Sequence, residues 1–62
     1  MYYILFRYGV TEIEYDIVFV PKGQDTLHGR GSWSLYTGKA FSSFEQADRY
    51  LYWQEVYNIL HP

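Results

Sequence analysis

The sequence predicts an α+β domain in which a three- to four-stranded antiparallel sheet packs against one C-terminal α-helix. The sheet would consist of an N-terminal β-hairpin plus one or two further strands. Three observations support this: alternating side chains in the first 20 residues, a glycine-containing polar segment after them, and a final run from Phe44 without Gly or Pro until Pro62. With 62 residues the chain has room for one domain, spanning 1–62.

Residues 2–20 are predicted to form the hairpin because they are rich in β-branched and aromatic side chains. Gly9-Val10 suits a two-residue type II′ turn, which would pair Phe6 with Ile13. One face of this hairpin then carries the side chains expected in the core. These are Tyr2, Ile4, Phe6, Tyr8, Ile13, Tyr15, Ile17 and Phe19.

The other face of the hairpin mixes charged and apolar side chains. Glu12, Glu14 and Asp16 form a row along the second strand, and the predicted register places Arg7 of the first strand opposite Glu12. At the open end of the hairpin this face carries an apolar patch that points outward and is a predicted protein interface, the alternative being that the domain uses these side chains in its own core. The patch consists of Tyr3, Leu5, Val18 and Val20.

Residues 21–31 are predicted to form a loop, and 32–41 one or two short strands. The loop contains three glycines and few apolar residues, which predicts a mobile segment with Leu27 as its only anchor. His28 and Arg30 are possible contacts for a partner, although both are also ordinary loop residues.

Residues 43–60 are predicted to form the helix, with Ser42 or Ser43 as its cap. The second half of this helix is apolar almost all round its axis, and one sheet covers only one side of a helix. The surplus apolar side chains therefore predict an interface, with Tyr52 or Ile59 turned toward the sheet. The predicted interface residues are Trp53, Val56, Tyr57 and Leu60.

Composition and motifs argue against catalysis. The chain has no cysteine, which excludes disulfides and thiolate zinc sites, and its two histidines are far apart. It contains no phosphate-binding glycine motif and no recognisable catalytic triad. The acidic row has the spacing of a glycosidase pair, about 6.8 Å, but a solvated strand face has the same pattern. We expect no enzymatic activity, no cofactor and no bound metal.

Self-association is expected because so short a chain buries only about 60% of its unfolded surface. Small domains usually add disulfides, a metal or a second subunit, and this one offers 23% aromatic residues instead. We predict a homodimer formed through the helix. The longest purely apolar run, Ile17–Val20, is too short for a membrane span or a secretion signal, so we expect a cytoplasmic protein without membrane contact.

The sequence favours a small protein-binding module, because interfaces are rich in aromatic residues and poor in lysine. A chain of this size is typical of accessory proteins by which bacteriophages and mobile elements inhibit a host or defence protein, an inference from size alone. The alternative is a single-stranded nucleic-acid-binding protein that stacks bases on sheet residues such as Tyr3 and Tyr36. The net charge of −2 argues against this alternative.

Overall fold

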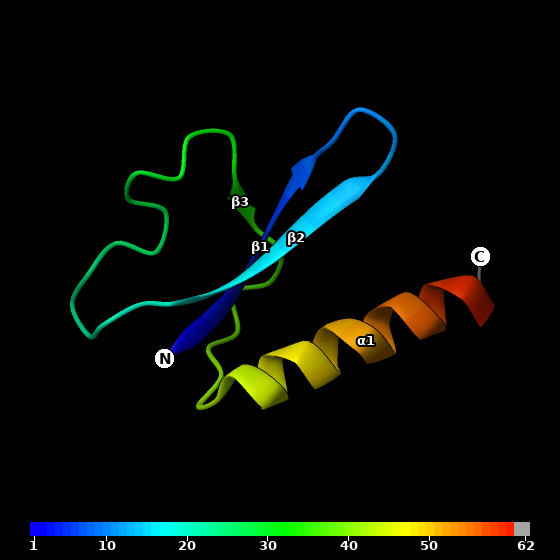
Figure 1. Cartoon of the computed structure of the whole chain (residues 1–62). Helices are drawn as coiled ribbons and strands as arrows, with labels where there is room; N and C mark the ends of the chain where they lie inside the picture. Colours follow the sequence, from blue (N-terminus) through cyan, green and yellow to red (C-terminus); the bar gives the residue numbers. More distant parts are fainter. Residues whose placement is uncertain (61–62) are drawn as a thin grey trace.

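The computed structural model describes residues 1–60 and has the predicted α+β architecture. Strands β1 (Tyr2–Tyr8), β2 (Ile13–Phe19) and β3 (Ser34–Leu35) precede the single helix α1 (Phe44–Leu60). The sheet is antiparallel with the order β2-β1-β3, and α1 runs across one of its faces (Figure 1). The fold class expected from the sequence is confirmed.

The hairpin register differs from the predicted one by two residues. Tyr8 lies opposite Ile13 rather than Thr11, so the connection is longer than a two-residue turn. The Gly9 N–H donates to the Glu12 carbonyl oxygen at 2.8 Å and closes this connection. Gly9 does not have a positive φ. Glycine is needed for space, because a Cβ at this position would lie 2.6 Å from that carbonyl oxygen.

The face assignment remains correct despite the register error, because side chains alternate with a period of two and a two-residue shift returns each one to the same face. Ile4, on the helix side of the sheet, is fully buried, and Ala47 of the helix is fully buried as well. The ends of this face are less covered than predicted. Ile13 is 43% exposed and Phe19 is 60% exposed.

The apolar patch on the opposite face is not an exposed surface, and this prediction is wrong. Leu5 is fully buried and Val18 is only 6% exposed, while Tyr3 and Val20 are half-buried. Leu5 and Val18 are therefore not available to a partner in this conformation. The reason is that the segment between β2 and β3 folds back over this face of the sheet.

Two side chains anchor that covering segment. Trp33 lies under the Arg7 guanidinium, 4.6 Å from its carbon to the ring centre. Arg30 forms an ion pair with Asp16 of β2 at 3.4 Å. Leu27, the only anchor expected from the sequence, is half-buried. Because Trp33 and Arg30 also hold the segment, Leu27 is not its sole tether.

The third strand is short, and the predicted fourth strand is reduced to a single bridge. Tyr2 and Phe41 exchange backbone hydrogen bonds of 2.7 and 2.8 Å. The helix begins three residues later, at Phe44, and the Ser43 hydroxyl accepts a hydrogen bond from the Gln46 N–H at 3.2 Å. Ser43 is thus the N-cap, and it is one of the two residues predicted for this position.

Candidate protein interface on the second half of the helix

The second half of α1 presents large apolar side chains to solvent. Four residues at helical spacing i, i+3, i+4 and i+7 share one side of the helix, and we call them the helix apolar surface. They are Trp53, Val56, Tyr57 and Leu60. Trp53, Tyr57 and Leu60 are 60%, 59% and 68% exposed, and Val56 is half-buried. Together they line a shallow hollow of about 320 Å³.

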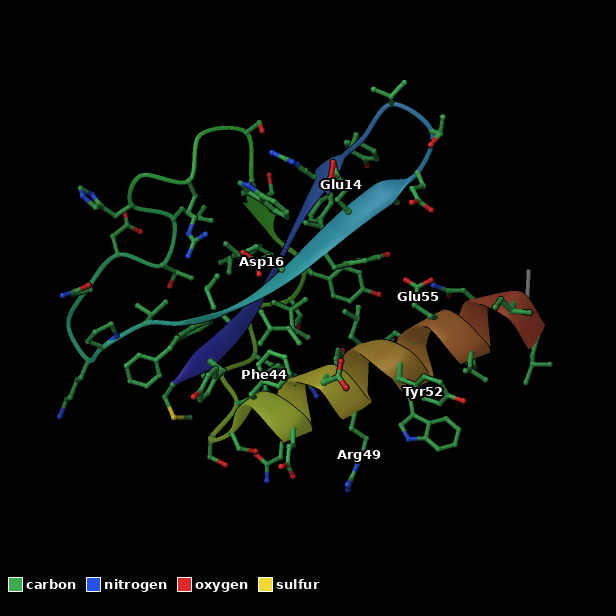
Figure 2. All side chains as sticks on the ribbon, viewed as in Figure 1. Glu14, Asp16, Phe44, Arg49, Tyr52 and Glu55 are labelled. Carbon is green, nitrogen blue, oxygen red and sulfur yellow. The ribbon has the colours of Figure 1, made fainter. Side chains whose placement is uncertain are left out.

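Glu55 turns toward the sheet, and the helix apolar surface lies on another side of α1 (Figure 2). Figure 2 shows Glu55 pointing toward β2 while Tyr52 points away from the sheet. The prediction that Tyr52 or Ile59 faces the sheet is wrong, since these side chains are 63% and 75% exposed.

A polar cluster lies between the sheet and the helix around Glu55. The rings of Tyr15 and Tyr36 meet edge to face, with centroids 5.3 Å apart. Burial raises the pKa of Tyr15, and the hydrogen bond that its hydroxyl donates to the Glu55 carboxylate, together with the negative charge of that carboxylate, raises the pKa further. Burial and the Glu55 charge also raise the pKa of Tyr36. Both hydroxyls therefore stay neutral at ordinary pH.

One oxygen of this cluster is unsatisfied. The Oε1 atom of Glu55 is buried and has no hydrogen-bond partner among residues 1–60. Glu55 was not predicted as a site residue, although its position four residues after Leu51 places both on one helix stripe. That spacing was the available signal for a carboxylate turned toward the sheet.

Two of the three carboxylates predicted on the other face of the sheet, Glu14 and Asp16, are paired within the chain. The Arg7 guanidinium donates two hydrogen bonds to the Glu14 carboxylate, at 3.1 and 3.3 Å. Arg30, a predicted loop contact, is half-buried and held by Asp16. His28, the other predicted loop contact, is exposed. Within residues 1–60 no group of three or more His, Cys, Asp or Glu is arranged to hold a metal ion.

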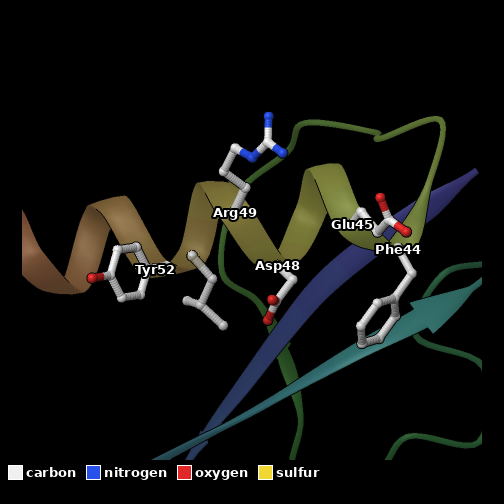
Figure 3. Close-up of a pocket in the computed structure, with 6 residues that line it drawn as sticks. Phe44, Glu45, Asp48, Arg49 and Tyr52 are labelled. Carbon is white, nitrogen blue, oxygen red and sulfur yellow. The ribbon is translucent and has the colours of Figure 1, made fainter.

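A second hollow, of about 570 Å³, lies along the first half of the helix (Figure 3). Phe44 and Tyr52 stand at its two ends, and Asp48 lies between them. Arg49 points away from Asp48, so the two charged groups do not converge on one position. Small-molecule sites need convergent polar groups in an enclosed cavity, and this open hollow does not provide them.

Comparison of the chain with protein-family models, with curated proteins and with solved structures finds no match in any of the three. In the part of the chain that the structure describes, no helix combines the length and the apolar character needed to cross a bilayer.

Proposed function

We propose that the protein is a small, non-enzymatic protein-binding module that contacts its partner through the helix apolar surface. The observation that carries this proposal is the exposure of Trp53 and Tyr57, at 60% and 59%, on one side of a capped helix. Trp and Tyr are the residues most often found at the energetic centre of protein interfaces. A solvent-exposed aromatic pair of this kind gains free energy when a partner covers it.

The size of this surface suits the centre of an interface. A fully buried aromatic side chain removes about 150–250 Å² from water, so Trp53 and Tyr57 at their present exposure each offer on the order of 100 Å². Leu60 extends the stripe by two further turns beyond Trp53. Anchors at this spacing match recognition of an amphipathic helix by an apolar groove. The partner is therefore expected to present such a groove.

Photocrosslinking tests this proposal. A benzoylphenylalanine placed at position 53 should capture one stoichiometric protein from the source cell. Phe44 is the matched control, because it is an aromatic residue of the same helix and is 51% exposed. With the captured protein purified, Trp53→Ala should weaken binding by about 30-fold or more, as a central anchor does. Equal capture from position 44, or unchanged affinity of Trp53→Ala, would contradict the proposal.

The identity of the partner remains a prediction from chain size: a host or defence protein in the cytoplasm, with the chain supplied by a phage or mobile element. The nucleic-acid alternative gains no support from the geometry. Arg7 and Arg30, two of the basic groups it requires, are each paired with a carboxylate. Tyr3 and Tyr36, its proposed stacking residues, are half-buried.

A further inference from the structure

The outer edge of β2 is open. The hydrogen bonds from the Gly9 N–H to Glu12 and from the Val20 N–H to Met1 mark the two ends of the β1–β2 ladder. Because hydrogen-bonded and non-hydrogen-bonded pairs alternate in an antiparallel ladder, the even-numbered residues of β2 bond to β1. The odd-numbered residues direct their N–H and C=O groups outward: Ile13, Tyr15, Ile17 and Phe19. None of residues 1–60 forms a hydrogen bond with these outward groups.

The spacing along this edge is self-complementary. A second copy of β2, placed antiparallel about a two-fold axis at Asp16, brings Ile13 opposite Phe19 of the second copy and Tyr15 opposite Ile17 of the second copy. All four outward residues of each strand then exchange hydrogen bonds. We propose that two copies of the chain pair through their β2 edges and form one continuous antiparallel sheet.

This pairing covers the two exposed ends of the helix-side face. Ile13 and Phe19 are 43% and 60% exposed in the single chain, although their strand positions belong to the core face. They lie at opposite ends of β2, equally far from Asp16. In the dimer, Ile13 of each copy therefore packs against Phe19 of the other copy. Apolar cross-strand pairs of this kind stabilise sheets.

The helices also meet in this arrangement. α1 contacts both β1 and β2, so it lies over the part of the sheet that includes the open edge. The two-fold axis places both helices on the same face of the continuous sheet, on either side of the paired β2 strands.

The side of α1 that would face the second copy carries exposed apolar residues. Glu55 reaches Tyr15 of β2, so it marks this side. Tyr52 lies three residues before Glu55 and Ile59 four residues after it, so both are next to Glu55 on the helix surface, with Tyr52 turned farther from the sheet (Figure 2). Within the single chain these two apolar side chains are 63% and 75% exposed. Pairing of the two helices would bury them.

The pairing places two Asp16 side chains near the axis, and like charges directly opposite each other destabilise a sheet. Each Asp16 already has the Arg30 guanidinium at 3.4 Å. Glu14 falls opposite Val18 of the second copy, so Asp16 is the one like-charge contact between the two β2 strands. The loop residue Arg30 therefore screens the position at which the two copies meet.

A second copy fits this edge better than a foreign strand. In the two-fold register every outward residue of β2 lies opposite an outward residue of the same strand in the other copy. Trp53 borders this helix contact, because its ring meets the Tyr52 ring edge to face with centroids 5.7 Å apart. Tyr57, five residues after Tyr52, lies on the far side of α1, so the dimer leaves this part of the helix apolar surface accessible on both copies.

Backbone N-methylation provides the first test, since a chain of 62 residues is accessible to chemical synthesis. Methylation of the Ile17 nitrogen removes an outward N–H and leaves the β1 ladder and the side chain intact. The matched control is the same change at Lys22, in the loop after the strand. Sedimentation equilibrium should show a dimer for the control. The Ile17 form should have a dissociation constant about tenfold higher or more, because symmetry removes two hydrogen bonds.

The second test introduces charged side chains at the two ends of β2. A chain with Ile13→Glu and Phe19→Glu, and a chain with Ile13→Lys and Phe19→Lys, should each be monomeric and folded by circular dichroism. An equimolar mixture of the two should form a heterodimer, because residue 13 of one copy lies opposite residue 19 of the other.

Three results would overturn the proposal: a wild-type monomer at high micromolar concentration, a dimer insensitive to Ile17 methylation, or a mixture of the charged chains that stays monomeric. Trp53→Ala is a further control. If it dissociates the dimer while the edge variants do not, self-association takes place through the helix apolar surface instead. Capture of a foreign protein at position 53 is independent of all these outcomes, so the two proposals fail separately.

Discussion

The two faces of the hairpin are buried to the same depth by different means. Ile4 and Leu5 are neighbours on β1 and point to opposite faces, yet both are fully buried. A regular helix covers the Ile4 face, and an irregular segment between β2 and β3 covers the Leu5 face (Figure 1). The hairpin is therefore the middle layer of a three-layer core, and a core of this kind does not require regular structure on both sides.

The chemistry of the two covers differs as well. The helix side uses aromatic edge-to-face contacts, such as Tyr15 with Tyr36, around one buried carboxylate oxygen. The other side is held by an ion pair to Asp16 and by the contact between Arg7 and Trp33. The contacts on the loop side involve part-exposed charges, and each contributes little to the free energy of unfolding. We therefore expect the loop cover to open more readily than the helix cover.

The largest effect is expected from truncating the two buried neighbours. Leu5→Ala and Ile4→Ala should each lower the free energy of unfolding by about 2–5 kcal/mol, because each leaves a cavity in a closed core. Urea denaturation at fixed protein concentration measures both. Val10→Ala is the control, since Val10 is fully exposed, and it should change stability by less than about 0.5 kcal/mol. A cost for Leu5→Ala near that of the control would show that the loop does not close its face.

The equal burial of Ile4 and Leu5 was only half predictable from the sequence. Alternation in β1 and β2 correctly assigned Ile4 to the helix side, because a half-buried strand has a period of two. The same alternation led to the wrong prediction of an exposed patch at Leu5 and Val18. Nothing in the polar, glycine-containing segment indicated that it would fold back, since its anchors are the long-range contacts of Arg30 and Trp33.

A smaller effect is expected from removing the indole of the loop cover. Trp33→Ala should lower the free energy of unfolding by about 1–3 kcal/mol, through lost apolar burial and the lost contact with Arg7. Hydrogen exchange should accelerate at the Arg30 N–H, which donates to Leu27 within the loop, before it accelerates in β1. Equal acceleration in both places would mean that the loop cover and the sheet open as one unit.

Alkaline pH tests the helix side. The pKa of Tyr15 is raised in the folded chain, so the neutral hydroxyl is favoured by folding. Its stabilising contribution is complete below the unfolded-state pKa of about 10 and is lost as the pH rises above that value. Tyr15→Phe should therefore flatten the loss of stability between about pH 10 and 11. Tyr8→Phe, at a position 80% exposed, is the control and should leave the loss unchanged.

The candidate site was predictable in part for a similar reason. The composition of the second half of the helix indicated surplus apolar surface, and Trp53, Tyr57 and Leu60 are indeed exposed. The rotation of the helix about its axis was not predictable, because apolar residues surround the axis and no single apolar stripe marks the side that faces the sheet. The turn from Gly9 to Glu12 was mispredicted because Gly9 relieves a close approach rather than a positive φ, and the two needs are indistinguishable in a sequence.

The smallest effect is expected from the ion pair of the loop cover. The Arg30 and Asp16 side chains are 36% and 46% exposed, so solvent screens their attraction. Arg30→Gln should therefore lower the free energy of unfolding by no more than about 1 kcal/mol at low salt, and by less at high salt. The same variant should weaken the proposed dimer more than it weakens the fold, since it leaves two Asp16 carboxylates facing each other without a guanidinium. The double variant Arg30→Gln with Asp16→Asn should restore dimerisation while leaving stability near that of Arg30→Gln. Failure of Asp16→Asn to restore dimerisation would mean that Arg30 acts through the loop cover, and not through the charge at the edge of the sheet.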